Sequence, residues 1–491
     1  MLIRSVRLLA PRSAGSPSAP LDVRTRGGAI AEIGTRLTAQ PGEDVHEADG
    51  AIAIPGLWDQ HVHVGQVAQG YSRLDTSEVR GTDAALTLVA RTLADRLDET
   101  PALVGFGHRL ADFAFSPTVA ALDSVAPTTP VVLIGGDAHH AWMNSAALTG
   151  LGMPPRDGIV GEDEWFDVLA HLDDLPGVAE GLEYGVALLQ SDALARGLVG
   201  LVDVEWARNY ERWAVRRPRL RVRAATYIAD LPGVPGPSGT PLEATGLARM
   251  GPLKVIADGS IGSRSAYSRD GSGMLNLDTE ELIGRLEAAR ASGLDVAVHA
   301  IGDAAAVVAL DAFAATGMRG RIEHAQMLAD EDIERMAALG ITGSVQPAHL
   351  LDDRDITEQL GEVEATRSYR FRDLLDAGVP LVLGSDAPVA PLDPWLAMAA
   401  AIHRSADERP GWRPAQSLQP REALAASTDG VTDLDIGGPA DLVLLEEDPF
   451  GDVPYGRDGL PDDGAARECA ARLRTVRPLA TIVAGALAAS R

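Results

Sequence analysis

Residues 294–317, LDVAVHAIGDAAAVVALDAFAATG, contain one complete unit of the predicted fold. The unit begins with a short apolar run at 294–298, continues through a polar turn and ends with a segment of helical period at 304–316. Gly317 follows this segment, and a glycine in this position is typical of a helix C-terminus. A strand, a turn and a helix in this order predict a βα unit, and the same rhythm repeats between residues 198 and 388.

The repeated rhythm supplies enough strands to close a barrel. Seven runs rich in apolar and β-branched residues lie at 200–204, 220–228, 253–257, 294–298, 321–324, 341–345 and 381–385. An eighth run at 51–59 precedes them and leads into His61. Helical intervals include 279–292, 304–316, 330–339 and 367–377, and a glycine follows each of them. Eight βα units predict an α/β fold of the (β/α)8 TIM-barrel type.

The two ends of the chain and one long insertion fall outside this rhythm. Both ends alternate apolar and polar side chains in short runs, which is typical of β-structure. We predict that residues 1–54 and 431–491 together form a composite β-sandwich domain, and that residues 55–430 form the barrel. The insertion after the first strand, about residues 65–190, would occupy a βα loop, where barrels concentrate their chemistry.

The composition excludes several classes of protein. The 491-residue chain has 43 Lys and Arg against 70 Asp and Glu, a formal net charge of −27. Binders of nucleic acid or of anionic membrane surfaces need clustered cations, so we expect neither kind of partner. A single cysteine, Cys469, cannot form an internal disulfide, and no run approaches the ~20 apolar residues of a membrane-spanning helix. Arg4 and Arg7 interrupt the first apolar run, so we expect no signal peptide and a cytoplasmic location.

Two histidines, His61 and His63, follow the first predicted strand. Residues i and i+2 of a strand point to the same side, so both imidazoles can meet one ion. Polar side chains also stand at the ends of four later predicted strands: Lys254, His299, His324 and Asp386. One such residue per strand end is what a site at the mouth of a barrel requires.

These candidate ligands have the chemistry of a catalytic metal site. Neutral imidazoles and carboxylates suit zinc, and a catalytic ion keeps one position for water. The ion lowers the pKa of that water from about 15.7 toward ~7, which yields a hydroxide at neutral pH. In this interpretation Asp386 takes the proton and returns it to a leaving nitrogen. The residues therefore predict a hydrolytic site with one or two ions.

Longer motifs around these residues resemble a known family. PGLWDQHVH at 55–63, with the four strand-end residues, resembles the metal-dependent amidohydrolase superfamily. GDAHHAWMNS at 136–145, ADGSIGSR at 257–264 and ADLVLLEEDP at 440–449 resemble its YtcJ-like branch. This is the amidohydrolase 3 type, which includes N-substituted formamide deformylases. The resemblance covers nearly the whole chain.

The resemblance implies roles for the candidate ligands. The family has a barrel, a composite β-sandwich, and zinc or a similar divalent ion at the strand ends. By position, His61 and His63 would bind the more buried ion, and His299 and His324 would bind the more exposed one. Lys254, if carboxylated by carbon dioxide, would bridge the two ions. Asp386 would contact the buried ion and handle protons.

Some positions depart from the family pattern and bear on the substrate. Ala138 and His140 stand where Gly and a small residue are expected, and LVD at 201–203 stands where a His-Asp pair is common. His139 and His140, in the insertion, and Arg264, after the fourth strand, are candidate substrate-binding residues. A surface or core role for His140 and a structural salt bridge for Arg264 are open alternatives.

Lys254 has two interpretations, because a lysine in an apolar strand must be paired or modified. One is an ion pair with a neighbour such as Asp258. The other is a carbamate, which we prefer because an unmodified lysine would bring a positive charge toward a cation. The remaining histidines, among them His46, His171, His349 and His403, carry no motif.

These observations predict a cytoplasmic metal-dependent hydrolase that cleaves a carbon–nitrogen bond of amide, formamide or cyclic amide type, other than an ordinary peptide bond, in a small molecule. Ester or lactone hydrolysis, or an isomerisation, on the same metal site is one alternative. A non-catalytic binding or scaffold barrel is another, although decay would be expected to remove at least one ligand. The substrate, the number of ions and a homo-oligomeric state stay open.

Overall fold

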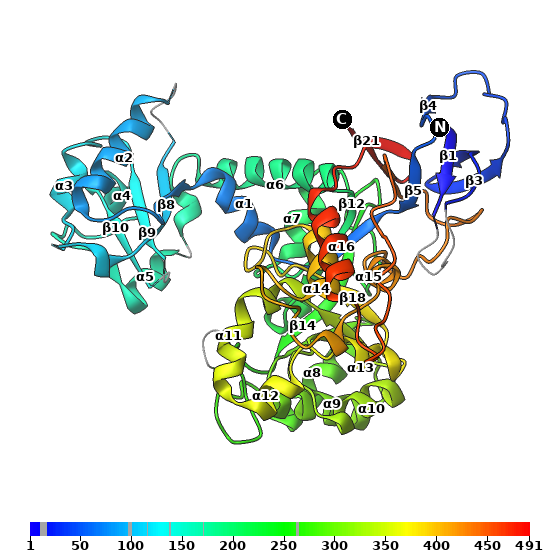
Figure 1. Ribbon diagram of the computed structural model, residues 1–491. Coiled ribbons are helices and arrows are strands. Elements are labelled where there is room, and N and C mark those ends of the chain that lie inside the picture. The colour runs from blue at the N-terminus through cyan, green and yellow to red at the C-terminus, as the bar shows by residue number, and fades with distance from the viewer. Residues whose placement is uncertain (10–16, 97–100, 115, 137–138, 170, 262–264) are drawn as a thin grey trace. The chain divides into compact units, whose positions relative to one another are not determined.

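The computed structural model describes the chain apart from residues 10–16, 97–100, 115, 137–138, 170 and 262–264 (Figure 1). Two compact units result from the pattern of contacts. The first joins Met1–Val64 to Gln190–Arg491, and the second is Gly65–Leu189. The second unit spans the residues of the long insertion.

The first unit contains a parallel barrel of eight strands. In pairing order they are β6 (Leu57–Val62), β12 (Leu198–Asp203), β13 (Arg221–Thr226), β14 (Ala248–Ile256), β15 (Val296–Ala300), β16 (Arg321–His324), β17 (Thr342–Val345) and β18 (Leu381–Leu383). Each of the eight predicted runs contains or overlaps one of these strands. The predicted barrel is therefore confirmed.

The last and first strands meet at a seam that completes the barrel. The Asp386 N–H donates to the His61 carbonyl at 2.7 Å, and the His63 N–H donates to the Ala387 carbonyl at 2.9 Å. A side chain at Gly384 would bring its Cβ to 2.9 Å from the backbone nitrogen of His61. Glycine is thus required where the two strands approach most closely.

Helices follow the barrel strands in the intervals where the sequence has a helical period. α8 (Thr279–Ala291), α9 (Asp303–Thr316) and α10 (Asp330–Leu339) lie beside one another on the outside of the barrel (Figure 1). Gly317 ends α9 in the left-handed conformation, at φ 62°. The interval predicted at 367–377 is shorter, because α12 (Glu362–Arg367) ends where it begins and Tyr369 has φ 55°. Only α13 (Phe371–Asp376) forms there.

The remaining helices of the first unit cover other parts of the barrel. They are α7 (Asn209–Val215), α11 (Leu350–Leu360), α14 (Pro394–His403), α15 (Pro420–Ala426) and α16 (Asp463–Thr475). Within the described parts of the chain, no helix combines the length and the apolar character needed to cross a membrane.

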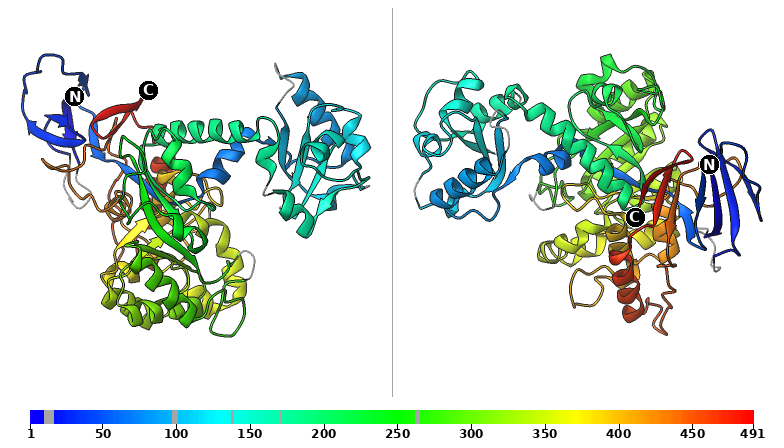
Figure 2. Two further views of the ribbon diagram at one scale, coloured as in Figure 1. Left: turned by 180° about the vertical axis from the view of Figure 1, so that it is seen from behind. Right: turned by 90° about the horizontal axis from the view of Figure 1, so that it is seen from above.

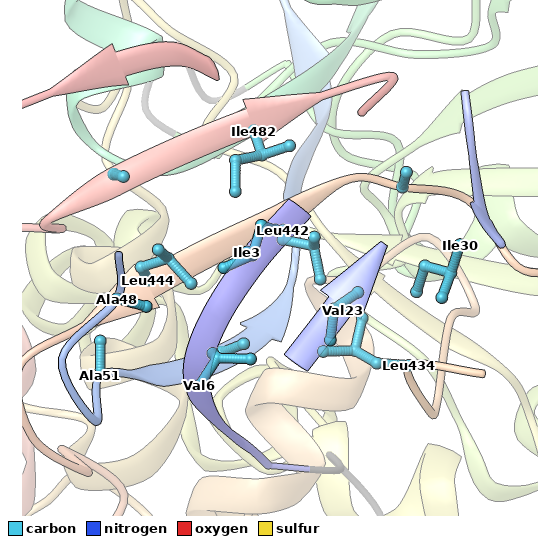
Figure 3. Close-up of a cluster of buried hydrophobic side chains, with 13 residues drawn as sticks. Ile3, Val6, Val23, Ile30, Ala48, Ala51, Leu434, Leu442, Leu444 and Ile482 are labelled. Atoms are coloured by element: carbon cyan, nitrogen blue, oxygen red, sulfur yellow. The ribbon is translucent and has the colours of Figure 1, made fainter. Parts of the chain in front are cut away.

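Strands from both ends of the chain share a second sheet. Its strands are β1 (Leu2–Leu8), β2 (Leu21–Arg26), β3 (Ala29–Gly34), β4 (Val45–Glu47), β5 (Ile52–Pro55), β19 (Leu442–Leu445), β20 (Ala480–Val483) and β21 (Ala486–Ser490). The N-terminal and C-terminal strands lie side by side in both views of Figure 2, and β5 pairs with β19. Ile3, Val23, Leu442 and Ile482 belong to the buried apolar cluster of this sheet (Figure 3).

The second unit has a sheet of its own. The strands are β7 (Leu74–Asp75), β8 (Leu103–His108), β9 (Val131–Gly135), β10 (His140–Met143) and β11 (Val160–Gly161). Its helices include α2 (Thr82–Ala94), α3 (Val119–Asp123), α4 (Ser145–Gly150) and α5 (Glu162–Leu169), while α1 (Val64–Ser72) and α6 (Val178–Ala195) run to its ends. Two separate buried clusters, one containing Trp165 and the other Trp142, show that the sheet has apolar side chains on both faces.

Candidate metal centre

Donor side chains gather where the barrel strands end. His61 lies near the end of β6, His324 is the last residue of β16, and Asp386 follows β18. Two groups of three donors have ligand atoms within 4.8 Å of one another: His61, His63 and Asp386 in one, and His324, His349 and Asp386 in the other. Asp386 belongs to both groups, so its carboxylate lies between the two sets of imidazoles.

The distances around Asp386 define the first group. Its Oδ1 lies 3.4 Å from Nε2 of His61 and 3.3 Å from Nε2 of His63. On the other side, its Oδ2 lies 3.8 Å from Nε2 of His349. An ion bound near Oδ1 would therefore have two imidazole nitrogens within reach.

His299 lies next to these groups without belonging to either. Its ring centroid is 4.5 Å from that of His324, and its Nε2 lies 3.1 Å from the carbonyl oxygen of Gly259. Because Nε2 donates to that carbonyl, Nδ1 is the nitrogen left to bind an ion. The sequence-predicted donors His61, His63, His324 and Asp386 are thus brought together, with His299 beside them.

A buried carboxylate fixes the orientation of His61. Oε2 of Glu323 lies 2.6 Å from Nδ1 of His61, and both side chains are almost fully buried. Arg321 balances the charge of Glu323 through an ion pair at 2.5 Å. This arrangement places the proton of His61 on Nδ1 and turns Nε2 toward Asp386.

Two of the donors stand on strained backbone. His324 has φ 70° and Asp386 has φ 56°, both in the left-handed region that β-carbon-bearing residues seldom adopt. Such conformations cost on the order of 1–3 kcal/mol and are common at active sites. The turns after β16 and β18 hold these two side chains toward the cluster.

The electrostatics of the cluster keep the imidazoles of His61, His299 and His324 neutral by lowering their pKa values. Burial, with the nearby charge of Lys254, lowers the pKa of His61 to about 4 and that of His299 to about 3. Burial alone would raise the pKa of Asp386, but His61 and the other surrounding imidazoles hold it well below its usual range. At neutral pH the cluster thus offers neutral nitrogens and an ionised carboxylate, the forms that bind a divalent ion.

Several buried nitrogens of the cluster fit a missing ligand. Among the described residues, no hydrogen-bond partner is present for His63 Nδ1, His324 Nδ1, His349 Nε2 or Lys254 Nζ. Buried polar atoms are normally satisfied, so these unpartnered nitrogens fit a site that binds an ion, and one of them, His349 Nε2, lies 3.8 Å from Oδ2 of Asp386. Imidazole and carboxylate donors suit zinc or a similar ion.

The surroundings of Lys254 bear on its two interpretations. The Asp258 carboxylate accepts the backbone N–H groups of Ile301 at 3.0 Å, of Gly302 at 2.8 Å and of Tyr267 at 3.0 Å. Within the described ranges, no ion pair joins Asp258 to Lys254. The side chain expected to neutralise the lysine is instead used to hold the loop after β15.

Two of the three predicted substrate-binding residues belong to the second unit, and the third lies outside the described residues. His139 is exposed in the second unit, and its Nδ1 lies 3.3 Å from Glu162. His140 is buried in the same unit, with its Nε2 at 3.3 Å from Nε2 of His108. Arg264 lies outside the described residues, as does Ala138. Substrate binding by these residues stays a prediction.

Two residues of the site were missed in the sequence. His349 was set aside as a histidine without a motif, yet it belongs to the second donor group. It follows β17 in a short turn, Pro347–His349, so the rule of one polar residue per strand end was the signal that pointed to it. Glu323 directly precedes His324, and a charge inside a buried strand was its only signal.

Comparisons with known proteins agree with the motifs. The family model described as "Amidohydrolase family" matches residues 44–486. YtcJ of Bacillus subtilis (strain 168) is 27% identical over 460 residues, which covers 82% of this chain and 85% of that protein. N-substituted formamide deformylase of Arthrobacter pascens is 26% identical over 499 residues, with 87% and 90% covered. A crystal structure of a metal-dependent hydrolase from Pyrococcus furiosus has the same fold, with a TM-score of 0.76, 24% identity, and coverage of 92% of this chain and 99% of that one.

Proposed function

Because the chain belongs to the amidohydrolase family, we propose that it is a metal-dependent hydrolase that cleaves the carbon–nitrogen bond of an amide, formamide or cyclic amide in a small molecule. The observation that supports the site most directly is the first donor group, in which two imidazoles and a carboxylate meet. The similarity to a formamide deformylase supports the class of bond.

We assign the ion to residues of the barrel mouth. The donors for one ion would be His61, His63 and Asp386, and those for a second would be His299 and His324. A carboxylated Lys254 would serve both ions. Zinc is the ion that this set suits best. When bound, the ion lowers the pKa of a coordinated water and polarises the substrate carbonyl.

The chain's own residues then orient the donors and move a proton. Glu323 accepts the Nδ1 proton of His61 and so keeps its Nε2 available. The Asp386 carboxylate, ionised at neutral pH, accepts the proton of the attacking water. The same carboxyl group returns that proton to the nitrogen of the leaving amine, which cannot depart as an anion.

The state of Lys254 supports its modification. Its Nζ is buried and lacks a hydrogen-bond partner among the described residues. Burial lowers the pKa of this amine to about 8, so a larger fraction is neutral than for an exposed lysine. Only a neutral amine adds to carbon dioxide, and the resulting carbamate is an anionic ligand.

The proposal also includes a second domain, a cellular location and a class of substrate. Residues 1–54 and 431–491 would form the composite β-sandwich that accompanies the barrel in this family. The single cysteine and the net charge of −27 favour a reducing cytoplasm and a small-molecule substrate rather than nucleic acid.

Metal analysis and a substrate panel test the proposal. Protein prepared without chelator should contain one to two equivalents of a divalent ion, and chelation should abolish turnover that zinc restores. The panel should comprise N-formyl amines, N-acyl amines and cyclic amides, with matched esters and lactones as controls. Well under one equivalent of metal, with no gain after reconstitution, contradicts the metal site. Turnover confined to the esters and lactones contradicts the carbon–nitrogen assignment.

A further inference from the structure

An exposed aromatic pair stands at the ends of two neighbouring barrel strands. Trp206 follows the end of β12, and Tyr227 directly follows β13. Their rings are stacked, with centroids 4.3 Å apart and planes inclined by 17°. Trp206 is nevertheless 48% exposed, whereas Trp142, Trp165, Trp213 and Trp395 are fully buried. Tyr227 therefore covers one part of the indole and leaves the rest open.

Backbone contacts place this pair beside the donor cluster. The Tyr227 hydroxyl donates to the carbonyl of Val204 at 2.7 Å, and the Val204 N–H donates to the carbonyl of Val62 at 2.8 Å. Val62 is the residue between His61 and His63 in the chain. Tyr227 is also close enough to the site for the charge of Asp386 to act on its phenol, although burial is the main reason that its pKa is raised.

The loop that presents Trp206 is held in one conformation. Ala207 and Arg208, which follow it, have φ 54° and 48°. The Arg208 N–H donates to the carboxylate of Asp230 at 3.0 Å, and the Tyr210 hydroxyl donates to the carbonyl of Asp230 at 3.2 Å. Two left-handed residues in succession persist only where such contacts fix them. These contacts position the backbone of the loop, and the stack on Tyr227 positions the indole.

We propose that Trp206, backed by Tyr227, is a stacking platform for a planar aromatic substituent of the substrate. The proposal rests on the proposed function, because the barrel-mouth site supplies the reacting centre. A flat ring can lie against the indole in the offset geometry that aromatic pairs prefer, and a saturated ring of similar size cannot.

Matched ligands separate stacking from simple apolar contact. For amides that differ only in a phenyl or a cyclohexyl substituent, kcat/KM should favour phenyl in the wild type. In Trp206→Leu the ratio should fall by roughly threefold to tenfold, the range that aromatic pairing contributes. Tyr455→Leu, which removes an exposed aromatic ring far along the chain, is the matched control and should leave the ratio unchanged.

Equilibrium binding keeps the test independent of turnover. Phenyl and cyclohexyl hydroxamic acids bind metal ions directly, so their Kd ratio on the zinc-loaded enzyme reports the platform even if no amide is cleaved. Trp206→Phe, which keeps an aromatic ring, should retain part of the phenyl preference if Trp206→Leu does not fold. A phenyl preference that survives in Trp206→Leu with metal intact overturns the platform and leaves the proposed function standing. Absence of amide turnover with a Trp206-dependent Kd ratio overturns the function and supports the platform.

Discussion

Two pairs of buried histidines in this molecule have nearly the same spacing and different surroundings. The rings of His61 and His324 in the barrel are 5.1 Å apart, and those of His108 and His140 in the insertion are 5.2 Å apart. His61 contacts Glu323 and Asp386, whereas His108 and His140 turn Nε2 toward Nε2. Within the described ranges, groups of three donors occur only at the barrel mouth. Nearly equal ring spacings thus occur at a group of three donors and at a pair of facing imidazoles, so ring spacing alone does not identify a metal site.

Replacing Asp386, the proposed proton carrier, should have the largest effect on turnover. In Asp386→Asn the amide cannot accept a proton at neutral pH, while His61 and His63 still offer two nitrogens to the ion. We expect turnover to fall by about 10² to 10⁴, the usual contribution of general acid–base catalysis, with most of the metal retained. Steady-state kinetics and elemental analysis on the same preparation measure both. Full metal with near-normal turnover would remove Asp386 from the mechanism.

The orienting carboxylate should have the next largest effect. Glu323→Gln keeps an oxygen near Nδ1 of His61 but leaves Arg321 without its counter-charge. Loss of such a partner typically lowers metal affinity by about 10-fold to 100-fold. Competition with a chelator of known affinity measures the apparent Kd for zinc. Glu422→Gln, in the ion pair with Arg372 elsewhere in the same unit, is the control and should leave that Kd unchanged.

Features of the barrel and its site could be predicted from the sequence where the signal lies within a few residues of the chain. The eight strands were predictable because most of their runs are largely apolar and each is bounded by turns, a signal that lies within a few residues. His61 and Asp386 were predictable for a related reason, since both lie at or just beyond the ends of those runs. The pairing of Glu323 with His61 joins two strands that are 262 residues apart in the chain, so no local pattern contains it. His349 was missed because a turn separates it from the end of β17.

Substrate contacts were harder to predict for a physical reason. His139 and His140 stand in a family motif, but a motif shows neither which side of a sheet a residue faces nor what it packs against. His140 is buried against His108 within the insertion, a contact between two strands of that unit. The exposed indole of Trp206 has no periodic signal, because it stands in an irregular loop.

The charge state of Lys254 should give a smaller and pH-dependent effect. Its amine has a pKa of about 8 in the folded protein against an ordinary value of 10.5. In metal-free protein kept free of carbon dioxide, the buried charge destabilises the fold fully below pH 8, and the loss disappears as the pH rises from 8 toward 10.5. The Tm of the wild type should therefore rise relative to that of Lys254→Met across this window. A constant difference in Tm would show that the amine is already paired or modified.

The insertion histidine should have the smallest effect on the metal. His140→Ala removes a buried ring, so the insertion should lose stability by about 0.5–3 kcal/mol, the range usual for point changes. Its zinc content and zinc Kd should equal those of the wild type, since His140 belongs to neither group of three donors. Calorimetry and metal analysis check the two parts. Loss of metal in His140→Ala would show that the two histidine pairs are not independent.

The seam between β18 and β6 determines when during biosynthesis this protein can acquire its ion. Asp386 reaches His61 and His63 only after the last barrel strand has joined the first. A nascent chain is made from its N-terminus, so both histidines leave the ribosome long before the carboxylate exists. Loading of the proposed site between His61, His63 and Asp386 would therefore follow synthesis of the whole barrel, and a truncated chain that lacks β18 should not retain an ion between these side chains.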